Sequence, residues 1–236
     1  MADGLERAKE AAARRAVEAL VRPGLSLALG TGTTAAWAVR AIADRFPHGL
    51  FDCVASSRAT EELARSLGLA VRPLAAGDQF DLMLDGADEV TPEFALTKGG
   101  GGALLREKLL AQLSREVAIL VDPTKLVHAL GERHPIPVEV VPFARPPLER
   151  AFVDLGYTVR LRTARDGGPY RTDNGNEILD LQPTAPITDP AAVEREIHAR
   201  VGVVETGVFI GLCHRLYVGH PDGTVEERRP ASGTPR

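Results

Sequence analysis

Short apolar segments that alternate with helical segments limit the fold of this chain more than any other feature of its sequence. The apolar run LSLALG ends in a glycine turn, and the segment AAWAVRAIADRF that follows has apolar residues at helical period. Residues 80–85 and 117–122 are two further apolar runs of strand length, and a helical segment at 103–114 lies between them. Because buried strands joined by helices form parallel sheets with both faces covered, the expected fold class is α/β.

The other elements of this first region follow from the same patterns and from helix stop signals such as Gly68. Helices are predicted at 5–21, 35–46 and 58–67, and short strands at 52–55 and 70–72.

A proline-rich stretch, HPIPVEVVPFARPP, changes the character of the sequence after Gly131. Beyond it we expect a second, smaller α+β domain of the split β-α-β type, with an Asn174-Gly175 turn and a helix capped by Asp189. Its helices are predicted at 146–155 and 190–200, and its strands at 157–163, 171–181 and 203–212. The predicted domains are residues 1–131 plus 208–236, and residues 132–207.

Composition restricts the partner of the chain. The 236 residues carry 28 basic and 32 acidic side chains in mixed order, a net charge of −4, so we expect neither a nucleic acid nor a membrane as partner. No apolar run has the length of a membrane span, and the N-terminus lacks a signal-peptide core. The two cysteines, Cys53 and Cys213, have no metal-ligand spacing. These features predict a cytoplasmic protein that binds a small molecule.

The turn Thr31-Gly32-Thr33-Thr34 lies between a predicted strand and a predicted helix. Helix N-terminal amides and three hydroxyls make a binding site for a phosphate, with a plain tight turn as the alternative. The turn also fits a dinucleotide pattern, but no acid ends the second strand, where the ribose would need one.

Acidic residues follow the next buried strand, in the sequence Asp85-Gly86-Ala87-Asp88-Glu89. Ligands of open α/β sheets bind at the carboxyl ends of strands, so Asp85 is the strongest candidate for the site. Asp88 has a second interpretation as a turn or cap residue. No further ligand group completes a metal site here.

Four consecutive glycines follow Lys98, and a helix follows them. Ordering such a run costs conformational entropy, so it indicates close approach of the backbone to a ligand, unless the run is a linker. Glu107 and Lys108 lie in that helix and, taken alone, are typical of surface charges. After the strand at 117–122, Lys125 is a candidate phosphate ligand or an exposed loop lysine.

In this order and spacing, these segments resemble ribose-5-phosphate isomerase of the A type. The blocks LALGTGTTAAWAV, DLMLDGADEV, TKGGGGALLREKLL, VDPTKLVHALG and RTDNGNEILD are all similar to blocks of that family, so the resemblance covers nearly the whole chain. It implies a Rossmann-like larger domain, a ferredoxin-like smaller one, and a homodimer or homotetramer. It also implies the interconversion of D-ribose 5-phosphate and D-ribulose 5-phosphate in the pentose phosphate pathway, without metal or organic cofactor.

Carried over to this sequence, the resemblance implies that Glu107 is the base that moves the proton and that Asp85 and Lys98 assist in catalysis. The substrate-binding residues it implies are Thr31, Gly32, Thr33, Thr34, Asp85, Gly86, Ala87, Asp88, Lys98, Gly99, Gly100, Gly101 and Lys125. Two positions depart from the family: Thr33 replaces a serine, and Glu10 stands where the family has a lysine, with Lys9 beside it.

Three other functions remain open from the sequence. The chain could be an amino-sugar phosphate isomerase or a CoA transferase of the same broad superfamily. It could be a sugar-phosphate sensor, which would need a DNA-binding segment, or a dinucleotide-dependent oxidoreductase, which the missing ribose acid disfavours.

Overall fold

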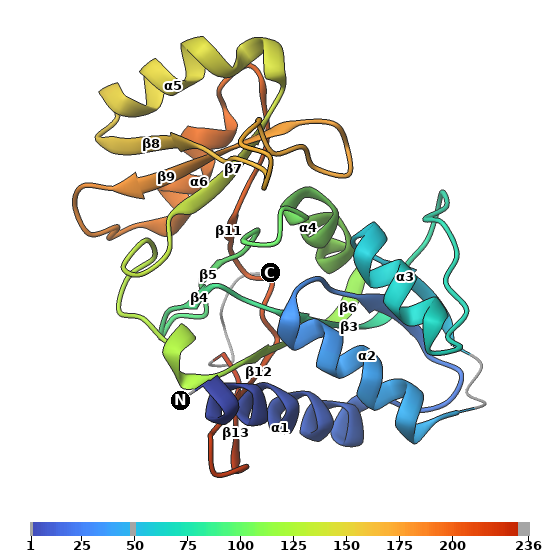
Figure 1. Ribbon diagram of the computed structural model, residues 1–236. Coiled ribbons are helices and arrows are strands. Elements are labelled where there is room, and N and C mark those ends of the chain that lie inside the picture. Colours follow the sequence, from blue (N-terminus) through green and yellow to red (C-terminus); the bar gives the residue numbers. More distant parts are fainter. Residues whose placement is uncertain (1, 48–50, 231–236) are drawn as a thin grey trace. The chain divides into compact units, whose positions relative to one another are not determined.

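The computed structural model describes residues 2–47 and 51–230, which divide into two compact units (Figure 1). The first unit consists of residues 1–87, 106–125 and 211–236, and the second of residues 88–105 and 126–210. The sequence assigned 88–105, 126–131 and 208–210 to the larger domain instead. A compact unit is not by itself an independently folding domain, so the domain boundaries stay a prediction.

A six-stranded sheet forms the centre of the first unit, with strand order β13-β12-β6-β3-β1-β2. All neighbours pair in parallel except β13 and β12, which pair antiparallel. The strands are β1 Ser26–Leu29, β2 Asp52–Ala55, β3 Phe80–Gly86, β6 Ser114–Val121, β12 Arg215–Gly219 and β13 Val225–Arg228. This confirms the mostly parallel α/β sheet.

The helices of this unit bury small and branched apolar residues against the sheet. Helices α1 (Ala2–Leu20) and α2 (Thr33–Arg45) pack side by side on one face, α1 over β12 and β6 and α2 over β3 (Figure 1). Alanines of α1 such as Ala8, Ala12 and Ala16 are fully buried, which lets that helix lie close to its neighbours. Helix α3 (Arg58–Ser66) packs against β2, and α4 (Leu104–Gln112) precedes β6.

The strand order creates one place where a ligand is expected. From β1 the chain proceeds to β2 on one side and returns to β3 on the other, so the strand order reverses between β1 and β3. Open α/β sheets bind ligands at the carboxyl ends of the two strands that flank such a reversal. Gly30 follows β1 directly, and Asp85 is the next-to-last residue of β3.

The second unit contains a four-stranded antiparallel sheet with order β10-β7-β9-β8. Its elements are β7 Ile136–Val140, α5 Arg145–Asp154, β8 Tyr157–Leu161, β9 Glu177–Pro183, α6 Pro190–His198 and β10 Val203–Thr206. One helix follows β7 and the other follows β9, which is the predicted split β-α-β arrangement. Asp189 caps α6 by accepting from the Ala192 N–H at 2.9 Å, as the sequence indicated.

Several sequence-based boundaries were wrong. The strand predicted at 70–72 is a single bridge between Val71 and Cys53. The strand predicted at 203–212 is divided into β10 and β11 (Val208–Phe209), which belong to different sheets. The proline-rich stretch, where the domain boundary stays a prediction, contains β7, a central strand of its sheet, which the sequence did not indicate.

The structure also contains elements that the sequence did not indicate. Two two-residue strands, β4 (Glu89–Val90) and β5 (Leu96–Thr97), join β11 in a small third sheet of the second unit. The segment at 171–181 forms its turn at Asn174-Gly175, but only the residues from Glu177 onward are a strand. Among the described residues, no helix is both long and apolar enough to cross a membrane.

Candidate active site

The turn between β1 and α2 presents a helix N-terminus. Gly32 is the N-cap residue with φ 104°, a conformation that favours glycine, and it has no side chain with which to cap α2. Thr33, the first residue of α2, is exposed, and Thr34 is half-buried. Backbone N–H groups at such an end are donors for an anion, and the helix dipole adds to the attraction.

Hydroxyl groups fix the start of this turn. The Thr31 hydroxyl lies 2.6 Å from the Ser56 Oγ and 2.9 Å from the Ser57 Oγ, at the end of β2. The Thr60 hydroxyl donates to the Gly30 carbonyl at 2.9 Å. The side chain of Thr31 thus contributes to holding the turn, whereas those of Thr33 and Thr34 follow it on the helix.

Asp85 ends β3 directly beside this turn and is fully buried. Its Oδ1 accepts from the Thr31 N–H at 3.1 Å and from the Gly86 N–H at 2.8 Å. A Cβ atom on Gly30 would lie 2.1 Å from the Asp85 carboxylate, so glycine is required there. The first unit therefore brings together Thr31 to Thr34 and Asp85 to Ala87, as the strand reversal predicts.

Glu107 and Lys108 are buried, with 3% and 5% of their surface exposed. The alternative that they are surface charges is therefore wrong. Glu107 lies in the first turn of α4, where an acidic residue is favourable to the helix dipole. A buried carboxylate needs polar partners or a function, so Glu107 remains the strongest candidate for the base.

Lys125 is the last residue of a short 3₁₀ helix, Pro123–Lys125, that follows β6. Its N–H donates to the Asp122 carbonyl at 3.1 Å, and the Asp122 carboxylate accepts from the Thr124 N–H at 2.9 Å. The side chain of Lys125 is half-buried, which sets it apart from an exposed loop lysine.

In the second unit, Lys98 and the glycines after it form an ordered turn rather than a linker. Lys98 is 3% exposed, and its Nζ lies 5.6 Å from the centre of the Phe209 ring. Its N–H donates to the Gly207 carbonyl at 2.8 Å. Gly99 and Gly102 have φ of 98° and 80°, so two of the four positions require glycine conformations.

Asp88 holds this turn from one side. Its carboxylate accepts from the Gly100 N–H at 2.7 Å, while its own N–H donates to the Thr97 carbonyl at 2.8 Å. No helix begins at Asp88, so the interpretation as a helix cap is wrong. The second unit thus brings together Asp88 and the segment Lys98 to Gly101.

Two residues that the sequence patterns did not indicate contact the same turn. An Nη1 of Arg162 donates to the carbonyls of Gly99 and Gly100, and the Tyr170 hydroxyl donates to the Gly101 carbonyl. Both residues lie more than sixty positions from the glycines. No local spacing connects them with that segment, so no sequence signal could have identified them.

Glu89, the third acid of the Asp85 to Glu89 segment, has a structural role. Its buried carboxylate accepts from the N–H groups of Gly131, Arg133 and His134 at 2.6 to 2.9 Å. Among the described residues, metal-ligating side chains cluster in one group, Glu194, His198 and Glu205, in the second unit. None of these three is a predicted site residue, and their contacts are those of an ion pair when His198 is protonated.

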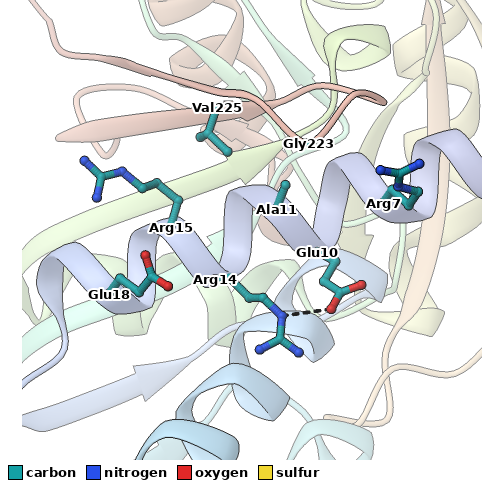
Figure 2. Close-up of a pocket in the computed structure, with 8 residues that line it drawn as sticks. All are labelled: Arg7, Glu10, Ala11, Arg14, Arg15, Glu18, Gly223 and Val225. Carbon is teal, nitrogen blue, oxygen red and sulfur yellow. Dashed lines mark hydrogen bonds and ion pairs between the residues drawn. The ribbon is translucent and has the colours of Figure 1, made fainter.

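Lys9 and Glu10, the two candidates for the family's N-terminal lysine position, have different partners. Lys9 pairs with Glu6 at 2.8 Å, and Glu6 also accepts from the Trp37 Nε1 on α2 at 3.0 Å. Glu10 pairs with Arg14 at 2.8 Å in a pocket of mixed charge beside Gly223 and Val225 (Figure 2). That pocket contains none of the predicted site residues.

Comparison with known proteins agrees with the resemblance seen in the motifs. Residues 52–223 match the family model of ribose 5-phosphate isomerase A (phosphoriboisomerase A). A ribose-5-phosphate isomerase A of Chloroflexus aurantiacus is 48% identical over 229 residues, covering 96% of this chain and 95% of the relative.

Solved structures give the same result. The ribose 5-phosphate isomerase of Plasmodium falciparum aligns with a TM-score of 0.91 and 31% identity, covering 96% of this chain and 100% of the other. A D-ribose-5-phosphate isomerase in complex with phospho-erythronic acid aligns with a TM-score of 0.90 and 31% identity, covering 95% and 99%. The chain described here therefore belongs to the ribose-5-phosphate isomerase A family.

Proposed function

We propose that this enzyme interconverts D-ribose 5-phosphate and D-ribulose 5-phosphate through an enediolate, with Glu107 as the proton-transferring base. The observation that carries the proposal is the burial of Glu107 in the first turn of α4, in a chain of this family. The place of this reaction is the pentose phosphate pathway.

The reaction moves one proton between neighbouring carbons. The base removes the proton on C2 of the open-chain aldose, and the same proton returns to C1. A second proton passes from the C2 hydroxyl to the C1 oxygen, so that the C1 carbonyl becomes a hydroxyl group and the C2 hydroxyl becomes a carbonyl. A single carboxylate placed over both carbons can perform both transfers, and we assign this task to Glu107. Removal from water makes such a carboxylate a stronger base than an exposed one.

Two further residues have assigned tasks. The sugar arrives largely as a closed ring, so a hydroxyl proton must be taken as the ring opens, and we assign this step to Asp85. Negative charge then develops on the oxygens of the enediolate. The Lys98 ammonium and the backbone N–H groups of the glycine turn are donors of the kind that stabilise such charge.

The phosphate fixes the sugar for these steps. We propose that the amides and hydroxyls from Thr31 to Thr34 bind it, with Lys125 as a point charge, and that Gly86 and Ala87 line the sugar site. The uncapped N-terminus of α2 supports this assignment. Anchoring the phosphate places the reacting carbons at a constant distance from the base, which lowers the entropic cost of the reaction.

The assembly is proposed on the family relationship. We expect a cytoplasmic homodimer, with a homotetramer as the alternative, so sedimentation should give twice or four times the chain mass of 25.2 kDa. A monomer at micromolar concentration would contradict this. Both cysteines are buried free thiols, in keeping with a reducing compartment.

Turnover of purified protein tests the proposal. With ribose 5-phosphate and no added metal, ketopentose phosphate should form, and Glu107→Gln should lower kcat by about 10²–10⁴-fold with a much smaller change in KM. Glu62→Gln on the exposed face of α3 is the matched control and should retain wild-type kinetics.

Three results would contradict the proposal. If Glu107→Gln turned over ribose 5-phosphate nearly as fast as the wild type, Glu107 would not be the base that transfers the proton. Turnover of an amino-sugar phosphate or a CoA ester in place of ribose 5-phosphate would assign the chain to a related activity. Loss of activity with a chelator would point to a metal-dependent reaction.

A further inference from the structure

We propose that Arg162 is a positioning residue for the glycine turn, Lys98 to Gly102, and that it sets the direction of the turn's backbone N–H groups. The inference rests on the proposed function, which gives those N–H groups their role. It adds a residue from the β8–β9 loop to the catalytic apparatus, together with its partners Asp180 and Tyr170.

The guanidinium of Arg162 uses its donors in two directions. Its Nε and Nη2 form a two-pronged ion pair with Asp180 on β9, with a distance of 3.0 Å for the Nε contact. Its Nη1 donates to the Gly99 carbonyl at 2.7 Å and to the Gly100 carbonyl at 3.2 Å. The planar fork of arginine makes both sets of contacts at once, which the single ammonium of lysine cannot do.

Both ends of this arrangement are held in place. The Arg162 N–H donates to the Ile178 carbonyl at 2.9 Å, and its carbonyl accepts from the Tyr170 N–H at 2.9 Å. The Arg162 and Asp180 side chains are each only 16% exposed, so water weakens the pair less than it would at the surface. The donors therefore meet the glycine turn from a rigid part of the antiparallel sheet.

The geometry of the peptide bond carries this effect to the other side of the turn. In a planar trans peptide, the carbonyl of one residue and the N–H of the next point in opposite directions, and the described residues contain no cis peptide. Fixing the Gly99 carbonyl on Arg162 directs the Gly100 N–H away from it, to Asp88 at 2.7 Å. Fixing the Gly100 carbonyl directs the Gly101 N–H away from Arg162 in the same manner.

The glycine turn supplies one hydrogen bond of its own, from the Gly102 N–H to the Gly99 carbonyl at 2.9 Å, and depends on side chains for the rest. Glycine has the widest range of backbone conformations, so a peptide between two glycines rotates easily unless its carbonyl is held. Gly100 and Gly101 are exposed, whereas Gly99 and Gly102 are buried. Because the Gly100 N–H donates to Asp88 and the Gly102 N–H to the Gly99 carbonyl, the Gly101 N–H is the donor of this exposed part that can face a substrate, and the carbonyl of its peptide is held by Arg162. Donors for developing charge act best when their orientation is fixed before the reaction.

The test is a kinetic comparison of Arg162→Gln and Arg162→Lys with the wild type. Both variants should lower kcat/KM for ribose 5-phosphate by about 10–100-fold, mostly through kcat, because the donors lose orientation rather than identity. Lysine keeps the charge beside Asp180, but its compact ammonium cannot pair with Asp180 and reach both carbonyls at once, so it should not rescue activity. Tyr170→Phe, which removes one neutral hydrogen bond at 3.3 Å, should lower kcat/KM by only about 2–5-fold.

A binding measurement separates positioning from a general loss of structure. Phospho-erythronic acid carries a carboxylate that mimics the charge of the enediolate, whereas inorganic phosphate tests only the phosphate site. Arg162→Gln should lower the affinity for phospho-erythronic acid by the same factor as kcat/KM. It should leave the affinity for inorganic phosphate within twofold of the wild-type value. Arg150→Gln, which breaks an exposed ion pair with Asp154 in the same unit, is the matched control and should change none of these values.

The outcomes are distinct. If the wild-type protein does not turn over ribose 5-phosphate, both the proposed function and the positioning role are overturned. Active wild type with Arg162→Gln within twofold of its kcat/KM would overturn the positioning role alone. An equal loss of affinity for phospho-erythronic acid and for inorganic phosphate would also overturn the positioning role, because a damaged fold would weaken the binding of both. If Arg162→Gln does not fold, Arg162→Lys decides, and near wild-type kinetics of that variant would refute the proposal.

Discussion

Two glycine turns precede helices among the described residues, and different kinds of side chain hold them in place. The turn before α2 is fixed by short side chains that end neighbouring strands, Ser56 and Asp85 among them. The turn before α4 is held by Asp88 at the Gly100 N–H, and at its carbonyls by the long side chains of Arg162 and Tyr170. A glycine turn at a strand end can thus be held by side chains at the ends of neighbouring strands. The run of four glycines is held in addition by long side chains more than sixty positions away in the sequence.

The difference predicts different tolerance to an added methyl group. In the turn before α2, the atoms that a new Cβ would meet belong to a short, doubly hydrogen-bonded carboxylate. At Gly102 in the turn before α4, they belong to the far end of a tyrosine side chain, which has more freedom to move.

The largest effect is expected for Gly30→Ala. Its Cβ would lie 2.1 Å from the Asp85 carboxylate, which two backbone N–H groups hold, so the strand end must shift. We expect a loss of about 3 kcal/mol in the free energy of unfolding by denaturant titration, at the upper end of overpacking costs. A fall in kcat/KM of roughly 100-fold should accompany it, because Asp85 is displaced.

Gly86→Ala is the matched control for stability. It lies at the end of the same strand β3, but its Cβ would meet Thr34 at an ordinary 3.6 Å. It should therefore lose less than about 1 kcal/mol. Equal losses for the two substitutions would show that close approach to Asp85 does not decide the requirement for glycine.

A smaller effect is expected for Gly102→Ala. The residue has φ 80°, which strains alanine by about 1–2 kcal/mol, and its Cβ would lie 2.3 Å from the Tyr170 hydroxyl. Movement of the tyrosine ring should relieve the second cost, so the total loss should stay below that of Gly30→Ala. Adding Tyr170→Phe to Gly102→Ala should cost less than the sum of the two single changes, since the two residues share one contact. Strict additivity would contradict this coupling.

The effect that is smallest near neutral pH is the ionisation of the thiols, and it distinguishes the two units. Cys53 and Cys213 both lie in the first unit, and burial raises the pKa of each thiol to about 12. An unfolded thiol ionises near 8.5, so the unfolded chain holds fewer protons between pH 8.5 and 12. The stability that the neutral thiols contribute is therefore complete below pH 8.5 and is lost as the pH rises toward 12.

Thiol alkylation at pH 8 should consequently report the opening of the first unit. Native protein should react slowly, because few buried thiols are ionised and accessible. Gly30→Ala should accelerate the reaction at low denaturant, whereas Gly102→Ala, in the second unit, should leave it at the wild-type rate. Acceleration by both substitutions would show that the two units open together.

The fold was predictable where a pattern is local. The apolar strand before Gly30 and the helix after it are adjacent in sequence, so the spacing of apolar residues and the glycine turn between them were enough to predict both elements. The segment at 203–212 was predicted as one strand because its apolar residues are continuous. Gly207 interrupts it, and a Cβ there would lie 2.3 Å from the Lys98 carbonyl, a close approach that no sequence pattern encodes. Strands of two residues, such as β4 and β5, are too short to show a period.

The residues of the candidate site also differ in whether a local sequence pattern could indicate them. Thr31 to Thr34 and Asp85 follow strand or helix signals and were accessible to sequence reasoning. Glu107 was identified through the family resemblance, because its helical position alone predicted a surface charge. Arg162 was not, because it contacts the glycine turn through a fold that places residues 62 and 63 positions apart together. The same holds for Glu89, whose carboxylate was considered as a metal ligand and instead binds three backbone N–H groups.

The bare N-terminus of α2 sets a limit for anyone who engineers this protein for heat resistance. A serine or aspartate at an N-cap is a common stabilising substitution, worth about 1 kcal/mol. At position 32 the new side chain would be strained by φ 104° and would occupy the donors proposed for the phosphate. A screen that ranks variants by melting temperature alone would misjudge this position, so stabilising changes are better sought at helix ends remote from the substrate.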